Sequence, residues 1–370
     1  MKLRPDRLNA WLNKHHFATP PVTYDLGAST GPVWTLRDLI ALDDGDTIDR
    51  LLASDLSYVH SRGGGELRRA LAAMAGVEER HVQVTTGGAE ALWILFLLAA
   101  EPGANVVVPQ RPSFPTFHEA PPALGIETRP YPMPVERDFA IDLAELYRLV
   151  DRHTRMIVVN RPHNPTGAVI GDDQLEQLHD FAVERDVQLV VDEVMHPIYH
   201  GTAPSSAARL PGATVVGDFS KALCLSGLRV GWMIERDTAR LTAYEHARSY
   251  FTVSSASLSE ALATIAVQHR EAICARAQTT AERNLARLDA FFSAHAEQLA
   301  WVRPRGGLTC LPWLRSGESA DALCERAAAA GVLVAPGSSF GVPHHFRIGF
   351  GATDQGFGDA VDHLDAIVVS

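Results

Sequence analysis

The sequence feature that most constrains the fold is a series of short apolar runs separated by helical patterns. The runs lie at residues 105–109, 156–160, 188–192, 214–218 and 229–234. They are almost continuously apolar rather than alternating, which is typical of strands buried on both faces of a mainly parallel sheet. Helical patterns at residues 89–100 and 172–185 lie between them, and the second opens with acidic residues, as the helix dipole favours. The sequence therefore predicts an α/β domain.

The composition changes after about residue 255. A long stretch rich in Ala, Arg and Glu runs to about Phe292 and predicts one or two extended helices. Beyond it, residues 332–335 and 346–350 have the pattern of short strands around a helix at residues 320–330. We therefore expect three parts: an N-terminal segment (1–44) that packs with the small domain and the active site, a large domain (45–255) and a small α+β domain (256–370).

Charge and composition exclude several classes of function. Lys and Arg number 33 against 44 Asp and Glu, which gives a net charge of −11. A nucleic-acid binder must neutralise phosphates with basic side chains, so we expect no nucleic-acid partner. The most apolar stretch, residues 89–100, contains Glu90 and is too short to span a bilayer, so no membrane partner is expected. The sequence has no signal-peptide pattern and no CxxC pair, so the chain is expected to be cytoplasmic. His196 and His200 have the spacing of metal ligands on a helix, but no third ligand is evident, so no metal site is expected.

Four motifs follow predicted strands or open predicted helices. Residues 220–232 (SKALCLSGLRVGW) place Lys221 at the end of a strand, where ligands of open α/β sheets bind. Residues 160–167 (NRPHNPTG) form a turn after another strand, and Asp192 ends a third. Residues 85–92 (TTGGAEAL) open a helix whose first backbone N–H groups suit an anion. Each motif alone is also compatible with a solvated lysine, a simple turn or a helix cap.

Taken together, the motifs closely resemble one family: the class I/II aminotransferase-like enzymes of pyridoxal 5′-phosphate (PLP) fold type I. Tyr58 followed by GGGELRRALA, and VAPGSSFG at residues 334–341 followed by FRIGFG, extend the resemblance over nearly the whole chain. The resemblance implies a PLP-dependent transferase fold type I. Its large domain holds a mainly parallel sheet, and its smaller domain is α+β.

The resemblance also assigns catalytic and substrate roles. Lys221 would form a Schiff base with PLP and carry protons to and from the substrate, because a desolvated lysine has a lowered pKa. Asp192 would bind the pyridine nitrogen and keep it protonated, which makes the ring an electron sink. Asn164 would contact the phenolic oxygen beside the substrate, and Phe114 would stack on the ring. Arg347 would hold the α-carboxylate of an amino or keto acid in a bidentate pair.

The cofactor phosphate has its own implied set of partners. The side chains of Arg229 and Ser220 and the backbone amides of Gly88 and Ala89 would hold it. In this family the residue that matches Tyr58 reaches the phosphate of the neighbouring subunit. The resemblance therefore implies a homodimer with Tyr58 contributed across the interface.

Two positions depart from the family pattern. The family usually reads DEVY where this chain reads DEVM, so Met195 cannot donate a hydrogen bond to the phenolic oxygen, and Asn164 is left as its main partner. Three residues before the lysine the family has Ser or Thr, whereas this chain has Asp218. A carboxylate beside a phosphate is unfavourable, so Asp218 should turn away or pair with a cation, and Ser220 could supply the hydroxyl.

The reaction stays open between two classes of chemistry that both begin by removing the Cα proton. Family frequency favours an aminotransferase. Segments at residues 28–42, 158–167, 226–232, 301–314, 323–337 and 346–351 also resemble PLP-dependent lyase/cyclases of the capreomycidine synthase type, which close a ring on a hydroxylated guanidino amino acid. A non-catalytic sensor on the same fold is a third hypothesis, which the presence of Lys221, Asp192 and Arg347 disfavours.

The sequence leaves the substrate side chain open. Arg62 and Arg161 are candidates for binding a second carboxylate. Asp218 and Glu193 are candidates for holding a guanidinium group. Their positions in the fold decide between these uses.

Overall fold

The fold is organised around one seven-stranded sheet. The computed structural model describes residues 3–43 and 45–369 of the chain. The strands are β2 (Val82–Thr85), β3 (Asn105–Pro109), β4 (Glu127–Tyr131), β5 (Thr154–Asn160), β6 (Gln188–Asp192), β7 (Ala213–Asp218) and β8 (Gly231–Ile234), in the order β2-β8-β7-β6-β5-β3-β4. Neighbouring strands are parallel except where β8 pairs with β7 and β2. The predicted α/β fold with a mainly parallel sheet is confirmed.

The apolar runs located five of these strands and missed β2 and β4. Strand β4 is a half-exposed edge strand of sequence ETRPY, so it lacks the apolar run of a central strand. Strand β2 is only four residues long. The strand expected at 229–234 begins at Gly231, because Arg229 has a φ of 52°, outside the extended region.

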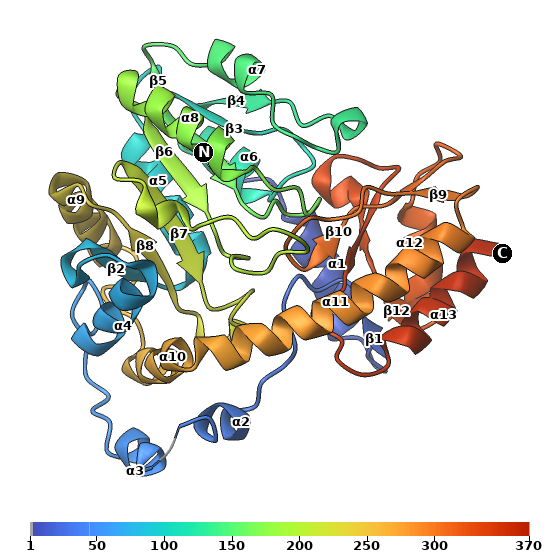
Figure 1. Cartoon of the computed structure of the whole chain (residues 1–370), viewed down its shortest axis with the longest axis horizontal. Helices are drawn as coiled ribbons and strands as arrows, with labels where there is room; N and C mark the ends of the chain where they lie inside the picture. Colours follow the sequence, from blue (N-terminus) through green and yellow to red (C-terminus); the bar gives the residue numbers. More distant parts are fainter. Residues whose placement is uncertain (1–2, 44, 370) are drawn as a thin grey trace.

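Helices cover both faces of the sheet (Figure 1). One face carries α5 (Gly87–Ala99), α6 (Thr116–Ala123) and α9 (Thr238–Ser249); the other carries α4 (Gly65–Ala75), α8 (Asp172–Glu184) and α10 (Ser257–Gln268). Val106 and Val108 pack in the first layer and Val107 in the second, as the alternation of side chains along a strand requires. No helix within residues 3–43 and 45–369 is long and apolar enough to cross a membrane.

The C-terminal part is connected to the sheet by one long helix. Helix α11 (Arg270–Ala294) leaves the region of α10 and runs across to the last elements of the chain (Figure 1). These elements are β9 (Leu299–Ala300), β10 (Thr309–Cys310), β11 (Trp313–Leu314), α12 (Asp321–Ala329), β12 (Val332–Leu333), β13 (Ala335–Pro336), β14 (Phe346–Gly349) and α13 (Phe357–Val369). Strand β14 lies between β10 and β13, and these short strands with α12 and α13 agree with the predicted α+β character. The domain boundaries after residues 44 and 255 stay predictions.

The N-terminal segment contacts the C-terminal part. Strand β1 (Tyr24–Asp25) pairs in parallel with β12, and α1 (Arg7–His16) contacts β13. Helices α2 (Leu36–Ile40) and α3 (Thr47–Leu52) then extend away from the sheet (Figure 1). The chain also has short 3₁₀ turns: η1 (Glu79–His81), η2 (Val135–Arg137), η3 (Ala207–Arg209), η4 (Ser226–Leu228) and η5 (Gly337–Phe340).

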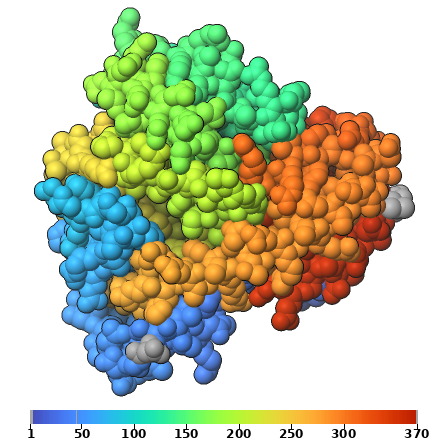
Figure 2. All heavy atoms as spheres, in the orientation of Figure 1, coloured from blue at the N-terminus to red at the C-terminus, as the bar shows by residue number. Residues whose placement is uncertain are grey.

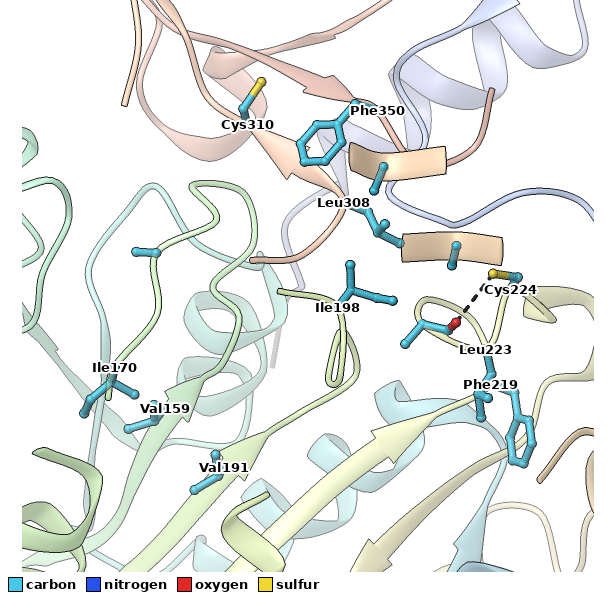
Figure 3. Packing of buried hydrophobic residues seen from close by; sticks show 14 of the residues in the cluster. Val159, Ile170, Val191, Ile198, Phe219, Leu223, Cys224, Leu308, Cys310 and Phe350 are labelled. Carbon is cyan, nitrogen blue, oxygen red and sulfur yellow. Dashed lines mark hydrogen bonds between the residues drawn. The ribbon is translucent and has the colours of Figure 1, made fainter. Parts of the chain in front are cut away.

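One apolar cluster joins the sheet to the C-terminal part. Ile198 and Leu223, which follow β6 and β7, belong to the same buried cluster as Leu308 and Phe350 (Figure 3). The space-filling view shows the orange C-terminal surface packed directly against the green residues that follow the sheet strands (Figure 2). The strand ends therefore face a second body of protein rather than open solvent.

Candidate active site

The predicted cofactor residues lie along one edge of the sheet. Strands β5, β6 and β7 are parallel and in register, with Asn160 opposite Asp192 and Asp192 opposite Val216. Their carboxyl ends therefore meet at the same edge. Asn164 follows β5 and Lys221 follows β7, so this edge carries three of the predicted side chains together.

Lys221 is partly buried at this edge. Its Nζ donates a hydrogen bond to Oγ of Ser29, at 2.9 Å. Burial is the main cause that lowers the pKa of the Lys221 amine; the positive charge of Arg347 lowers it further, while the nearby carboxylate of Asp218 raises it. A lowered pKa makes the neutral amine, the form that accepts a proton, easier to reach, which agrees with the proton-carrying role predicted for this residue.

Arg347 on β14 has a buried guanidinium group that donates hydrogen bonds to neutral oxygens. Its side chain donates to the carbonyl oxygen of Gly27 at 2.6 Å and to Oδ1 of Asn164 at 3.3 Å. Its Nε is buried without a hydrogen-bond partner among the described residues. Burial lowers the pKa of Arg347 to about 10. A buried cation with an unsatisfied donor and no carboxylate contact is suited to a carboxylate brought by a ligand.

An anion cradle forms where β2 leads into α5. A Cβ at Gly87 would lie 2.5 Å from Nη2 of Arg229, so only glycine lets the guanidinium approach this backbone. Nη1 of Arg229 lies 3.3 Å from Oγ of Ser220. Gly88 and Ala89 are in the first turn of α5, where backbone N–H groups have no partner within the helix. The four residues predicted to hold the phosphate therefore lie close together, and their phosphate role stays a prediction.

Asp192, at the end of β6, is a buried carboxyl. Its Oδ1 accepts a hydrogen bond from the backbone N–H of Val194 at 3.1 Å. Burial raises the pKa of Asp192 to about 7, and the neighbouring charge of Asp218 adds to the rise. A cationic ring nitrogen placed beside this carboxyl would stabilise its ionised form.

Asp218 faces the cradle instead of turning away from it. Its Oδ1 accepts a hydrogen bond from the backbone N–H of Ser220 at 2.9 Å. Its Oδ2 lies 3.5 Å from where a Cβ of Gly88 would stand. Of the two expectations for Asp218, turning away from the helix start is not what this geometry shows; pairing with a cation stays a prediction, and the Asp218 carboxylate raises the pKa of nearby Lys221.

Met195 is packed as an apolar side chain. It is 1% exposed, and a Cβ at Gly307 would lie 2.8 Å from its Sδ. The segment around Gly307 therefore closes directly over Met195, and the position offers no hydroxyl to a ligand.

Phe114 and Tyr58 differ in exposure. Phe114 is half-buried and meets Phe117 edge to face, with ring centroids 5.7 Å apart. Tyr58 is 83% exposed, so its ring is not packed into the site of its own chain.

The other charged candidates are engaged in structural contacts. Arg161 is fully buried and donates to the carbonyl oxygen of Ser205 and to Asp172. Glu193 accepts from Oγ of Ser206 at 2.6 Å and from the backbone N–H of Ala207 at 2.8 Å.

Arg62 is also committed elsewhere, since it donates to the carbonyl oxygen of Arg80 at 2.7 Å and lies near Glu245. Both arginines therefore already have an acidic neighbour, Asp172 for Arg161 and Glu245 for Arg62, although Nε of each has no hydrogen-bond partner among the described residues. Glu193 is engaged by Ser206 and Ala207.

Sequence reasoning missed two residues of this site, Gly27 and Ser29. They belong to the segment that follows β1 and reach Arg347 and Lys221 from more than 190 residues away. No strand or helix periodicity marks them; the one signal was that residues 28–42, which include Ser29, resemble the cyclases.

Comparison with known proteins identifies this arrangement. The family described as aminotransferase class I and II matches residues 51–364. The chain belongs to that family. It is 33% identical over 351 residues to capreomycidine synthase of Streptomyces vinaceus, covering 93% of this chain and 88% of that protein. It is 30% identical over 324 residues to aspartate/prephenate aminotransferase of Thermus thermophilus, covering 84% and 83% of the two chains.

The fold comparison agrees. The solved structure of the PLP-dependent cyclase OrfR superimposes with a TM-score of 0.89 at 29% identity and covers 100% of this chain and 98% of that one. This protein is therefore a fold type I enzyme, and its cofactor is PLP. The residues fit the cofactor: a buried carboxyl with a raised pKa, a glycine cradle beside Arg229 and a partly buried lysine converge at one sheet edge.

Proposed function

We propose that the enzyme transfers an amino group between an α-amino acid and an α-keto acid. The observation that carries this is Arg347: a buried guanidinium with an unpartnered Nε, hydrogen-bonded to Asn164 at 3.3 Å on the sheet edge that also carries Lys221. Such a group binds the α-carboxylate that amino and keto acids share. When bound, PLP supplies an electron sink for breaking bonds at Cα.

The residues of the chain divide the remaining work. Arg347 and Asn164 fix the carboxylate end of the substrate, which orients the Cα–H bond. Lys221, with its lowered pKa, takes the proton from Cα and returns one. Asp192 supports a positive charge on the ring nitrogen, and the cradle at α5 holds the phosphate. Leu308 and Phe350 belong to the apolar cluster that joins the sheet to the C-terminal part, and they bring apolar surface to this side of the strand ends.

The second candidate is a cyclase that expels a leaving group from the side chain of a guanidino amino acid and closes a ring. The similarity to capreomycidine synthase and to OrfR favours it. So does Met195, which removes a hydroxyl that the usual family pattern provides. The engagement of Glu193 with Ser206 and Ala207 means that a guanidinium needs another acidic partner.

The experiment that separates the two candidates follows the α-amino nitrogen. Amino acids labelled with ¹⁵N, including arginine and 3-hydroxyarginine, are incubated with the holoenzyme and pyruvate, and products are identified by mass spectrometry. Transfer of ¹⁵N to alanine with release of a keto acid supports the aminotransferase. Retention of ¹⁵N in a product one water lighter than the substrate establishes the cyclase instead.

We further propose that the enzyme is a cytoplasmic homodimer in which Tyr58 completes the phosphate site of the partner. Two observations support the dimer: Tyr58 is 83% exposed, and the same region exposes Leu52 and Leu56, each 80%. A second copy of the chain would cover these side chains. The free thiols of all four cysteines support a reducing compartment.

A further inference from the structure

The structure places a hydroxyl group directly on the amino group of Lys221. Oγ of Ser29 lies 2.9 Å from Nζ of Lys221, although the two residues are 192 positions apart in the chain. Ser29 is 7% exposed, so bulk water does not compete for this contact. Within residues 3–43 and 45–369, Ser29 is the side chain that hydrogen-bonds this nitrogen.

Hydrogen bonds to Asp25 and Arg347 hold the segment that carries Ser29 beside the predicted carboxylate site. The backbone N–H groups of Gly27 and Ala28 donate to Oδ1 of Asp25, at 2.8 and 3.0 Å. The carbonyl oxygen of Gly27 accepts from Arg347 at 2.6 Å. One short segment therefore contacts both the guanidinium that fits the substrate carboxylate and the lysine that fits the Cα proton.

The same segment is closely packed on its other sides. A Cβ at Gly349 would stand 1.7 Å from the carbonyl oxygen of Ala28, and one at Gly31 would stand 2.2 Å from Sγ of Cys224. The backbone N–H of Gly349 also donates to the carbonyl oxygen of Leu26 at 2.7 Å. The position of the Ser29 hydroxyl is thus set by the protein rather than by a mobile loop.

A hydroxyl suits this position because it can form a hydrogen bond with both the charged and the neutral form of the lysine amine. The charged groups around Lys221 act in opposite directions: Asp218 and Asp192 favour the ammonium form, and Arg347 and Arg229 favour the neutral amine. A serine hydroxyl accepts a hydrogen bond from an ammonium group and donates one to a neutral amine. Lys221 must adopt both forms when it takes a proton and returns it.

We propose that Ser29 is a positioning residue for Lys221: its hydroxyl holds the free amino group in both protonation states and keeps the nitrogen directed at the Cα proton of a bound amino acid. This inference rests on the proposed function, since it requires Lys221 to move that proton. It holds equally for transamination and for cyclisation, because both begin at Cα–H.

The test measures exchange of the Cα proton for deuterium in D₂O by NMR, with holoenzyme and an amino acid panel. The variants are Ser29→Ala, Ser29→Thr, which retains a hydroxyl, and Thr30→Ala, which removes the next hydroxyl along the chain. A second readout uses apoprotein: the rate at which Lys221 captures PLP covalently, followed by absorbance. Ser29→Ala is expected to slow Cα exchange by roughly 10- to 100-fold, as the loss of alignment of an acid–base group does, without changing KM.

Ser29→Ala is also expected to slow PLP capture, Ser29→Thr to restore both rates, and Thr30→Ala to leave both at the wild-type value. Wild-type rates in Ser29→Ala would overturn the inference. So would equal slowing in Thr30→Ala, or failure of Ser29→Thr to restore either rate at a wild-type melting temperature. A wild-type enzyme that exchanges no amino acid contradicts the proposed function itself.

Discussion

Nη1 of Arg347 and Oδ1 of Asn164 lie 3.3 Å apart, although 183 residues separate them in the chain. Arg347 comes from the C-terminal sheet, and Asn164 comes from the turn that follows β5. The contact joins the group that fits a substrate carboxylate to a residue on the cofactor edge. The geometry of the site therefore depends on how the C-terminal part packs against the large sheet.

Replacement of Arg347 by lysine tests the carboxylate site while keeping the charge. A lysine cannot form the bidentate pair, so Arg347→Lys should lose about 1.5–3 kcal/mol of binding, a roughly 10- to 100-fold rise in KM. Steady-state kinetics with the best amino acid measures this. Arg148→Lys on the exposed helix α7 (Leu143–Arg148) is the matched control. A KM equal to that of the wild type removes Arg347 from the substrate site.

Lys221 is readily assigned chemically, because the chain contains only three lysines: Lys2, Lys14 and Lys221. After reduction with borohydride, peptide mass spectrometry should find the cofactor adduct on Lys221. Lys221→Ala should abolish the adduct and turnover, while Lys14→Ala, which removes an exposed ion pair with Glu325, should keep both. An adduct on Lys14 in the wild type would refute the assignment.

Tyr58 should act across the subunit interface. Tyr58→Phe removes a hydrogen bond to a charged phosphate, worth about 1.5–3 kcal/mol, so PLP should bind roughly tenfold or more weakly. Tyr250→Phe, at another exposed tyrosine, is the control. PLP affinity is measured by fluorescence titration of the apoprotein.

Mixed dimers show from which subunit Tyr58 acts. Co-expressed Tyr58→Phe and Lys221→Ala chains should form a hybrid with one intact site, which recovers activity above either parent. Activity no greater than that of the Tyr58→Phe parent would place Tyr58 in the site of its own chain or outside it.

Asp192 should make the stability of the apoprotein depend on pH. Its pKa is raised by burial from 3.8 to about 7, so the folded state holds the proton more tightly than the unfolded state. The folded state therefore loses stability as pH rises from about 4 to 7, and the loss is complete above that range. Apo Asp192→Asn should melt higher than wild type at pH 8, with the difference fading towards pH 4.

The same variant should bind PLP more weakly, because the ring nitrogen loses its anionic partner. Asp173→Asn, at an exposed position in α8, should change neither property. Identical melting temperatures for Asp192→Asn and wild type across this pH range would mean that the Asp192 carboxyl does not have a raised pKa in the apoprotein.

The central strands and the residues at their ends were predictable because their signals are local. A strand buried on both faces must be almost continuously apolar, which marks β5 and β6 in the sequence. Lys221, Asp192 and Asn164 follow such runs directly, so their shared edge follows from parallel pairing. Edge strand β4 was not predictable in this way, because its exposed face carries polar side chains.

The partners of the charged residues were not predictable. In sequence, Arg161 and Glu193 are as plausible in a substrate pocket as Arg347 is. The fold gives Arg161 a carboxylate partner, Asp172, whereas the hydrogen-bond partners of Arg347 among the described residues are the neutral oxygens of Asn164 and Gly27. Which buried cation meets a carboxylate depends on the chain segments that pack around it, and those segments are distant in sequence.

The sequence by itself determined the α/β architecture and the cofactor class, because short motifs beside predicted strands carry both, and it predicted which residues act on the cofactor. Only the tertiary structure decided that Asp218 faces the helix start, that Met195 is closed over by Gly307, and that Ser29 meets Lys221. The physical reason is that hydrogen bonds and close packing act over a few ångströms in space. Gly88 and Asp218, Met195 and Gly307, and Ser29 and Lys221 are each more than 100 residues apart in the chain.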